Sequence, residues 1–440
     1  MNKLALFGGE NDLKREWPGW PYSTQDELNS LSRVLESKKW FSGFLGGDEE
    51  SEVGNLEREF GEYNKTDHAI AVSNGEAALV IALRAAGIGS GDEVIIPAWT
   101  FMATSSAALH LGAVPVFADI NPVNLCLDPN DVKKKITEDT KAIITVHYGG
   151  RLGNIDELMN IAEQSKLVLI EDACHSHGSE YRGIKAGNFG LLGCFSFQES
   201  KTMTSGEGGM LTTNNDEIAK IAKSYRSNGR KVGSPGYLHY RLGWNYRMTE
   251  FQAAILREQL SRLDEQVKLR TKNANKLTKI LEEIPGFTPF YEPEGMSQNS
   301  NYLYPVKIDL DYFGINKKNA VNYARRKGVT RDSSLIPACN IIEDALRMEG
   351  LPCNTVYIPL YRSPLFNSEN WENSGMQFFS RYINKKIDLS PLGKSDKAFD
   401  EIVDLSHNVL LSNDEGIETV GKIFEKVSKN AIEIKETLNN

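Results

Sequence analysis

A single lysine stands between an apolar stretch and a glycine-rich turn. The sequence FSFQESKTMTSGEGGM runs from Phe195 to Met210 and places Lys201 after the apolar residues and before three glycines. An amine that is partly shielded from water can lose its proton and attack a carbonyl group. Small residues and glycines let the backbone turn closely around such an amine. Taken alone, however, a lysine in this place is most often an ordinary solvated side chain.

Three other short segments carry groups suited to binding an anion or an aromatic ring. VSNGEAAL places Gly75 where an apolar run turns into a helical pattern, and the free N–H groups of a helix N-terminus bind phosphate. PAWTF ends another apolar run with Trp99 and Phe101. Each of these features also has a structural explanation, as a common strand–glycine–helix turn or as a core aromatic residue. LVLIEDACHSHG ends a third apolar run with Glu171, Asp172, His175 and His177.

Together the four segments describe a site for one kind of ligand. Proteins bind pyridoxal phosphate through a lysine bonded to its aldehyde and a carboxylate paired with its ring nitrogen. A helix N-terminus for the phosphate and an aromatic side chain for the ring complete this set. A metal-dependent hydrolase using Glu171, Asp172, His175 and His177 is the alternative. It is the weaker hypothesis, because adjacent ligands on one strand end point in alternating directions.

The elements around these segments predict an α/β fold with a mostly parallel central sheet flanked by helices. Strand-like runs alternate with helical patterns from residue 69 to residue 173, which is typical of βαβ units. The strand-like runs are almost continuously apolar, as expected when both faces of a parallel sheet are covered. Ligands of open α/β sheets bind beyond the carboxyl ends of the strands, and all four segments fall at such ends.

Changes of pattern along the chain predict three parts. Residues 1–50 contain prolines before a helical pattern and are expected to form an arm. Residues 51–285 contain the alternating pattern and one long helical stretch, so we expect a large cofactor-binding α/β domain. Residues 286–440 are expected to form a smaller α+β domain against which the arm packs.

The composition argues against several classes of function. The chain has 440 residues, a formal net charge of −9 and no run of basic residues. We therefore expect neither nucleic acid nor an anionic membrane as its main partner. No apolar stretch approaches the ~20 residues that cross a bilayer, and the N-terminus lacks the apolar core of a signal peptide. Five scattered cysteines without a C-x-x-C pair indicate free thiols in a reducing cytoplasm.

The motifs, taken in order, resemble those of the sugar aminotransferases of the DegT/DnrJ/StrS family, within the fold-type I pyridoxal phosphate-dependent transferases. The resemblance extends from about residue 15 to the C-terminus. The lysine motif is most similar to a subgroup that includes 3-amino-5-hydroxybenzoate synthases and glutamine-dependent scyllo-inosose aminotransferases. The motifs are SNGEAALVIALRAAGIGSGDEVIIPAWTF, GAVPVFADI, IEDACHSHGS, FSFQESKTMTSGEGG, GWNYRMTEFQAAIL and IVDLSHNVLL.

The resemblance implies a role for each candidate residue. Lys201 bonds to the cofactor aldehyde and moves protons during amino transfer, while Asp172 keeps the pyridine nitrogen protonated. His175 contacts the phenolic oxygen of the cofactor, and Phe101 stacks on its ring. The phosphate is held by the hydroxyl of Ser196, the backbone amides of Gly75 and Glu76, and Asn245 from the neighbouring subunit.

Glu76 departs from the family pattern, because relatives usually have threonine at this position. A carboxylate that faced a phosphate would be repelled by it, so we expect the Glu76 side chain to point away and its backbone amide to bind. The departure also motivates another hypothesis, in which the protein is a non-catalytic or accessory partner that keeps the fold and a weak cofactor site.

The resemblance implies an aminotransferase that moves an amino group from glutamine or glutamate to a keto-cyclitol or a keto-sugar, in particular a nucleotide-linked one. It also implies a homodimer with shared active sites. The alternative role of Asn245 is to cap the helix that begins near Thr249, although Thr249 can cap that helix alone. We expect the loop 227–244 and the C-terminal domain to shape the acceptor pocket.

Overall fold

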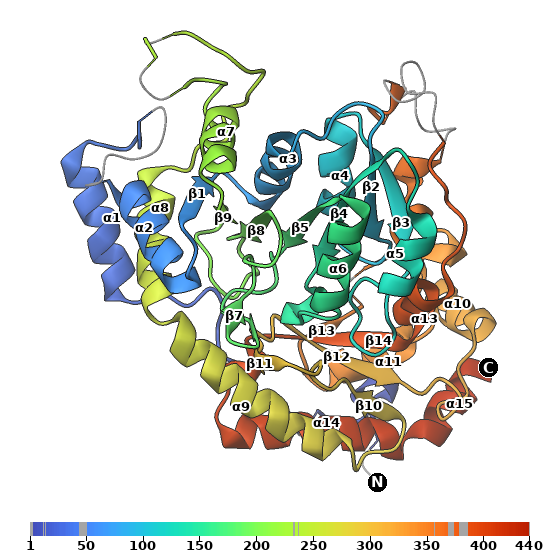
Figure 1. Cartoon of the computed structure of the whole chain (residues 1–440). Coiled ribbons are helices and arrows are strands. Elements are labelled where there is room, and N and C mark those ends of the chain that lie inside the picture. Colours follow the sequence, from blue (N-terminus) through green and yellow to red (C-terminus); the bar gives the residue numbers. More distant parts are fainter. Residues whose placement is uncertain are drawn as a thin grey trace.

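A seven-stranded sheet forms the centre of the computed structural model (Figure 1). Its strand order is β1-β9-β8-β5-β4-β2-β3; β9 runs antiparallel to β1 and β8, and the other adjacent pairs are parallel. The predicted α/β fold with a mostly parallel sheet is therefore confirmed. The strands are β1 (His68–Val72), β2 (Glu93–Pro97), β3 (Val114–Ala118), β4 (Thr140–Val146), β5 (Val168–Asp172), β8 (Leu192–Ser196) and β9 (Gly209–Thr213). The structure describes residues 3–11, 13, 15–43, 51–231, 234–235, 237–355, 357–367, 374–377 and 386–439.

Helices cover both faces of this sheet because its strands are apolar on both sides. One face packs on α3 (Gly75–Ala85), α4 (Ala103–His110) and α7 (Asp216–Arg226). The other face packs on α2 (Glu52–Asn64), α5 (Pro129–Lys135), α6 (Ile155–Ser165) and α8 (Glu250–Ser261). Each covered face has its own cluster of buried apolar side chains, which fixes the positions of the strand ends.

A smaller antiparallel sheet of four strands lies beside the large one, with strand order β10-β12-β14-β13. A third sheet of three short strands has the order β11-β6-β7. The strands are β6 (Glu180–Tyr181), β7 (Ile184–Lys185), β10 (Phe287–Pro289), β11 (Met296–Gln298), β12 (Leu303–Ile308), β13 (Cys353–Asn354) and β14 (Ile402–Ser406). The other helices are α1 (Gln25–Ser37), α9 (Leu263–Leu281), α10 (Lys317–Arg326), α11 (Asn340–Met348), α13 (Gly393–Glu401), α14 (Asp414–Lys429) and α15 (Ala431–Asn439).

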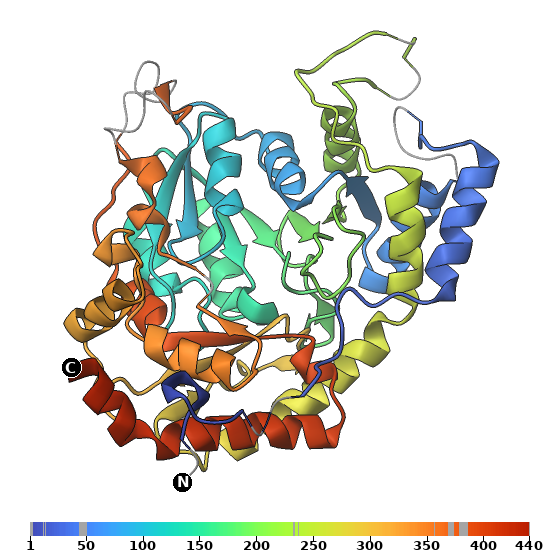
Figure 2. The same ribbon diagram turned by 180° about the vertical axis from the view of Figure 1, so that it is seen from behind.

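The N-terminal segment contacts both parts of the molecule. Leu4 is fully buried in the apolar core of the four-stranded sheet and its helices. Figure 2 shows the blue N-terminal chain beside the red C-terminal helices. From there the chain runs upward to α1. Helix α1 packs on α8, where the side chain of Gln259 donates a hydrogen bond of 2.9 Å to Glu27.

The long helical stretch predicted after residue 249 is divided into α8 and α9. The break lies at Arg262, whose φ of −111° and ψ of 2° leave the helical region. The Arg262 guanidinium forms an ion pair with Glu27 of α1. The N-terminal arm is therefore tied to the point where the helix bends.

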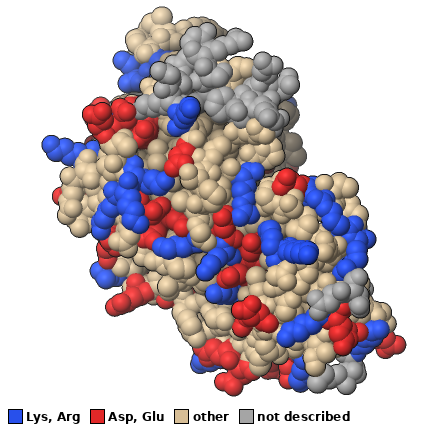
Figure 3. All heavy atoms as spheres, turned by 90° about the vertical axis from the view of Figure 1, so that its right-hand side faces the viewer, with Lys and Arg blue, Asp and Glu red and all other residues tan. Residues whose placement is uncertain are grey.

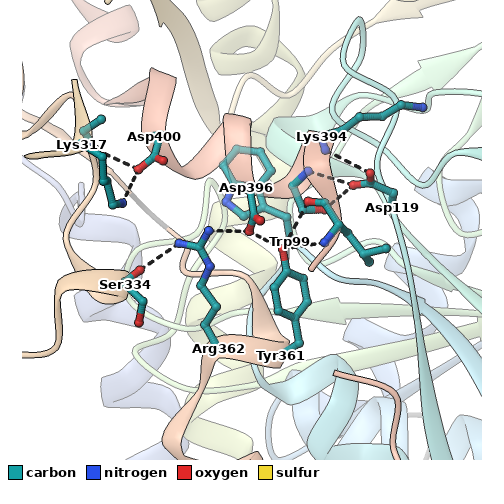
Figure 4. Close-up of polar contacts among 12 residues, drawn as sticks. Trp99, Asp119, Lys317, Ser334, Tyr361, Arg362, Lys394, Asp396 and Asp400 are labelled. Carbon is teal, nitrogen blue, oxygen red and sulfur yellow. Dashed lines mark hydrogen bonds and ion pairs between the residues drawn. The ribbon is translucent and has the colours of Figure 1, made fainter. Parts of the chain in front are cut away.

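Helix α13 connects the four-stranded sheet to the large one (Figure 4). The backbone N–H of Lys394, at its start, donates to Asp119 after β3 at 3.0 Å. Two residues further on, Asp396 accepts the guanidinium of Arg362 at 2.6 Å. These contacts hold the segment 357–367 against the large sheet.

Opposite charges are mixed on the face of the molecule seen in Figure 3. Neighbouring opposite charges form ion pairs such as Lys133 with Glu157, at 2.7 Å. Such mixing gives no extended field of one sign among the described residues of this face. Among the residues that the structure describes, no helix combines the length and the apolar character needed to span a bilayer.

Candidate active site

The N-terminus of α3 forms a narrow cradle between strand ends. A Cβ atom on Gly75 would lie 2.7 Å from the Cβ of Ser196, the last residue of β8, so the close approach requires glycine. A Cβ atom on Gly209, the first residue of β9, would lie 2.4 Å from the carbonyl oxygen of Asn74. The two glycines therefore bring the ends of β8 and β9 against the start of the helix.

This cradle offers hydrogen-bond donors to an anion. Asn74 caps α3 by accepting the N–H of Ala77 at 2.8 Å. The N–H groups of Gly75 and Glu76 have no partner within the described part of the chain. The side chain of Glu76 is exposed. Free amides at a helix N-terminus, with the hydroxyl of Ser196 beside them, suit a phosphate group.

Asp172 ends β5 and is held in one orientation by two donors. Its Oδ2 accepts the hydroxyl of Thr104 at 2.9 Å, and its Oδ1 accepts the N–H of Cys174 at 3.3 Å. The side chain is buried. A buried carboxylate fixed in this way can pair with a protonated ring nitrogen that reaches the strand end. Burial raises the pKa of the neighbouring Cys174 thiol well above its usual range, and the charge of Asp172 raises it further.

Glu171, one residue earlier, faces the opposite side of β5 and has a structural role. Its carboxylate accepts backbone N–H groups of the turn 187–190 at 2.6–2.8 Å. It also pairs with Nε2 of His147 at 2.9 Å. Within the described residues, no group of three or more His, Cys, Asp or Glu side chains is placed to hold a metal ion. The arrangement gives no support to the metal-dependent hydrolase.

His175 is a neutral hydrogen-bond donor. Its Nδ1 accepts the N–H of Gly149 at 3.3 Å, so the proton of the neutral ring lies on Nε2, which is 3.1 Å from the hydroxyl of Tyr357. Burial lowers the pKa of His175 well below its usual range, and the charge of Lys201 lowers it further. A neutral Nε2–H suits the phenolic oxygen that the resemblance assigns to this residue.

Lys201 lies in a tight turn after β8 and is half-buried, as the sequence requires of a reactive amine. Its N–H donates to the carbonyl of Gln198 at 2.9 Å. Its Nζ lies 4.2 Å from the ring centroid of Tyr302. The ring of His175 lies 4.3 Å from that same Tyr302 ring, so the amine and the imidazole occupy the same region.

His177 does not join this cluster. Its ring lies 5.6 Å from that of Phe195 and 5.5 Å from that of Phe197, inside the core below the strand ends. Burial lowers the pKa of His177 to about 3. His177 is therefore neutral, as His175 is, but it packs among core aromatic rings, whereas His175 lies beside Tyr302 and Tyr357.

The two aromatic residues of PAWTF have different environments. Trp99 is fully buried, stacks on Tyr148 with ring centroids 4.5 Å apart, and donates its indole N–H to the carbonyl of Tyr357 at 2.8 Å. Phe101 is 60% exposed, and its ring centroid is 6.5 Å from that of Tyr357. Phe101 thus has a ring face available for a ligand, while Trp99 is a core residue.

Comparisons with known proteins agree with this geometry. The model of the DegT/DnrJ/EryC1/StrS aminotransferase family matches residues 21–341, more than half of the chain. The chain belongs to the DegT/DnrJ/EryC1/StrS aminotransferase family. Membership in this family identifies an enzyme of the aminotransferase class. The hypothesis of a non-catalytic accessory partner rested on Glu76, whose side chain is exposed. Lys201 and Asp172 are both present.

Similar members of the family cover almost the whole chain. The L-glutamine:2-deoxy-scyllo-inosose aminotransferase of Streptomyces kanamyceticus is 34% identical over 441 residues, which are 97% of this chain and 97% of the relative. The 3-amino-5-hydroxybenzoate synthase of Amycolatopsis mediterranei is 33% identical over 411 residues, covering 93% of this chain and 96% of the relative. A crystal structure of 3-amino-5-hydroxybenzoic acid synthase has a TM-score of 0.79 at 32% identity. The match covers 95% of this chain and 99% of the chain in that structure.

Asn245 lies in a segment whose next residue, Tyr246, accepts the N–H of Ser73 at 2.8 Å, just before the start of α3. It is exposed and forms an isolated antiparallel bridge with Ser227. Thr249 caps α8 in a reciprocal capping box with Gln252, so Asn245 is not the helix cap. Its position leaves the side chain available to a group outside its own subunit.

Sequence reasoning did not single out four residues that complete the site. Thr104 lies within a helical pattern and has no distinguishing signal. Tyr302 stands at the start of a predicted strand, and His407 lies in the motif IVDLSHNVLL, which was noted only as a resemblance. Tyr357 lies in a stretch without a clear periodicity. Three of the four come from beyond residue 285, so only the tertiary structure brings them to Lys201.

Proposed function

We propose that this protein uses pyridoxal 5'-phosphate to move an amino group from glutamine or glutamate to a keto-cyclitol or a keto-sugar. The observation that carries the proposal is the convergence of three groups at adjacent strand ends: the cradle at Gly75, the fixed carboxylate of Asp172 and the half-buried amine of Lys201. Each group matches one part of the cofactor.

The residues present fit pyridoxal phosphate. The amides of Gly75 and Glu76 with Ser196 would hold the phosphate, and the two glycines of the cradle leave room for it. Phe101 would cover the ring. When bound, the cofactor supplies an electron sink for the charge that develops on the carbon that loses its proton.

The side chains of the chain have separate tasks in this reaction. Asp172 holds a proton on the ring nitrogen through its charge. His175 donates its Nε2–H to the phenolic oxygen and stays neutral because it is buried. Lys201 carries a proton between neighbouring atoms of the bound donor and cofactor, since it is the amine in this cluster. The ring of Phe101 excludes water from one side.

The substrates are proposed from the names of the relatives. The relative from Streptomyces kanamyceticus is named for L-glutamine and 2-deoxy-scyllo-inosose. A relative from Streptomyces griseus, 33% identical with 98% of this chain and 99% of the relative covered, is named for L-glutamine and scyllo-inosose. A keto-cyclitol is therefore the first acceptor to test, and a nucleotide-linked keto-sugar is the second. The test starts from protein loaded with the cofactor. Glutamine, glutamate and alanine are compared by the change that each causes in the visible absorbance.

The acceptor is then identified with the aminated form of the enzyme. Scyllo-inosose, 2-deoxy-scyllo-inosose and nucleotide-linked keto-sugars are added separately, and amino products are detected by mass spectrometry. We expect glutamine to bleach the visible band and a keto-cyclitol to restore it. Protein that shows no visible band with pyridoxal phosphate, or no change with any donor, would contradict the proposed function.

We also propose a homodimer in which Asn245 reaches the phosphate of the neighbouring subunit. The support is its exposed position and a nearby loop, seen extending from the body in Figure 1, that exposes large apolar side chains. Tyr237 is 84% exposed and Leu242 is 81% exposed. Mixing Lys201→Ala with Asn245→Ala subunits creates one intact site per mixed dimer. Activity well above either variant alone is expected, and none despite confirmed subunit exchange would contradict a shared site.

Two further proposals concern organisation and location. We propose that residues 1–50, 51–285 and 286–440 act as arm, large domain and small domain, because the seven-stranded sheet lies wholly within residues 51–285 and the four-stranded sheet wholly within residues 286–440. We propose a cytoplasmic location, in keeping with five cysteines that are all free in the structure.

A further inference from the structure

The loop that carries Lys201 is anchored by residues distant in the sequence. The indole N–H of Trp20 donates to the carbonyl of Glu199 at 2.9 Å. Nε2 of His407 lies 3.0 Å from the carbonyl of Ser200, and the hydroxyl of Tyr302 lies 2.9 Å from the Ser200 hydroxyl. Two consecutive residues before Lys201 are therefore fixed by the N-terminal arm and by the four-stranded sheet.

Tyr302 also contacts the amine itself. The Lys201 Nζ lies over its ring, 4.2 Å from the centroid. The ring of His175 lies 4.3 Å from that of Tyr302 on the side of the proposed cofactor site. The face of an aromatic ring is negative, so it attracts a protonated lysine, more strongly where water is excluded. The contact places the amine beside the residue expected at the phenolic oxygen.

His407 contacts both the loop of Lys201 and the ring of Tyr302. Its Nε2 faces a carbonyl oxygen, which can only accept, so Nε2 carries the proton. Burial lowers the pKa of His407 well below its usual range, so the ring stays neutral and this hydrogen bond is permanent. The ring lies 6.0 Å from that of Tyr302 at an interplanar angle of 29°.

The two anchors lie side by side. Tyr302 directly precedes β12 and His407 directly follows β14, and these strands pair with Leu303 opposite Ser406. The anchors are thus neighbours at one end of one strand pair, and the small sheet contacts the loop of Lys201 at two points.

We propose that Tyr302 is a positioning residue for Lys201. Its ring face holds the amine beside His175, and its hydroxyl, together with His407, fixes the backbone of the loop. The inference rests on the proposed function, because it requires Lys201 to be the reacting amine. A fixed amine meets the reacting carbon without a search through side-chain conformations, so positioning raises the rate of the steps in which Lys201 acts once it has lost its proton.

The first test measures how fast protein freed of cofactor bonds to added pyridoxal phosphate, followed by the rise of visible absorbance. Tyr302→Leu removes the ring face and is expected to slow this step by roughly tenfold, within the range of such contacts. Tyr302→Phe keeps the face and is expected to slow it by less than about threefold. Tyr304→Phe is the matched control, because its hydroxyl bonds to Thr278 at 2.8 Å, away from the site.

Pentafluorophenylalanine at position 302 separates electrostatics from shape. It keeps the ring but reverses the charge of its face, so it is expected to behave like Tyr302→Leu and unlike Tyr302→Phe. This variant also preserves the test if Tyr302→Leu does not fold. Equal bonding rates for the fluorinated ring and for phenylalanine would overturn a role for the ring face.

The second test asks whether Tyr302 acts through Lys201. Methylamine is added to Lys201→Ala as a replacement amine, and single-turnover rates with glutamine are measured. Tyr302→Leu is expected to lower the rate about tenfold when Lys201 is present. It should change the methylamine-rescued rate less than about twofold, because the free amine needs no positioning.

The outcomes distinguish this inference from the proposed function. An equal fall in both backgrounds, or no fall in either, would overturn the role of Tyr302 and leave the proposed function in place. Full turnover of Lys201→Ala without methylamine would instead overturn the proposed function. Unchanged thermal melting of the Tyr302 variants separates positioning from a loss of fold.

Discussion

Asp172 and Lys201 lie at the ends of two neighbouring strands, but different parts of the chain hold them in place. Asp172 is fixed by Thr104 and Cys174, which belong to the same large sheet and its first layer of helices. The loop of Lys201 is fixed by Tyr302 and His407 from the small sheet, with a further contact from the arm. One half of the site is therefore built locally, and the other half is completed by distant segments.

The difference has a functional consequence. In the proposed function, the cradle and Asp172 hold parts of the cofactor that stay in place, and their contacts lie within the large sheet and its helices. Lys201 is the group proposed to react, and the anchors of its loop come from the small sheet. The contrast predicts that changes in the local half weaken cofactor binding or electronic activation, while changes in the distant half alter how the amine is presented.

The largest effect is expected for Asp172→Asn. Asparagine keeps the size of the side chain but loses the charge that holds a proton on the ring nitrogen. We expect kcat to fall by about 10³- to 10⁴-fold, because the charge acts mainly when the electron sink develops. Cofactor affinity should fall by less than about tenfold. Steady-state kinetics and a cofactor titration measure both; near-normal turnover would show that Asp172 only caps the strand end.

Asp404 lies at a buried contact between the small sheet and the part of the molecule built around the large sheet. It lies in β14 and accepts the hydroxyl of Tyr148, from the large sheet, at 2.7 Å. Burial raises the pKa of Asp404 from 3.8 to about 7, although the hydrogen bond from Tyr148 and the charge of Arg151 act in the opposite direction. The folded protein therefore binds this proton more tightly than the unfolded chain, and stability falls as the pH rises from about 4 to about 7.

Asp404→Asn should remove this fall in stability. Asparagine can still accept the hydroxyl of Tyr148 but has no charge to bury. We expect the variant to be more stable than the wild type at pH 8 by up to about 4 kcal/mol and equal to it near pH 4. Thermal melting across this pH range is the measurement. A pH dependence identical in both proteins would mean that Asp404 is not the group responsible.

Gly75→Ala tests the cradle of the local half. The added Cβ would lie 2.7 Å from that of Ser196, so the helix start and β8 must separate. We expect cofactor affinity to fall by about 10²-fold and stability by about 1–3 kcal/mol. Gly393→Ala is the matched control, since Gly393 also begins a helix and its added Cβ would meet nothing within 4 Å. Equal cofactor affinity in the two variants would contradict the cradle.

The local half is also the part that the sequence predicts best. The runs of apolar residues predict the strands. Gly75, Asp172, Ser196 and Lys201 can each be predicted because they lie at or shortly after the end of such a run. Family resemblance was needed for Asn245, whose exposed position gives no local signal. Because successive side chains of a strand point to opposite faces, Glu171 and Asp172 must lie on different faces of the sheet. Which of the two faces holds the site is decided by the packing of the helices.

The distant half could not be predicted from local pattern. Ser200 and Tyr302 are 102 positions apart, and Ser200 and His407 are 207 positions apart. Their contact depends on how the small sheet packs, which composition and periodicity do not determine. The break at Arg262 could not be predicted for a similar reason, because no glycine or proline marks it and the ion pair of Arg262 is with Glu27 of the distant arm.

The most direct test of the account is to identify the residue that bonds to the cofactor. Protein loaded with pyridoxal phosphate is reduced with borohydride, digested and mapped by mass spectrometry. The account predicts one labelled peptide, containing Lys201, and no labelled peptide from Lys201→Ala treated in the same way. A label on any other lysine, or a label retained in Lys201→Ala, would contradict the account.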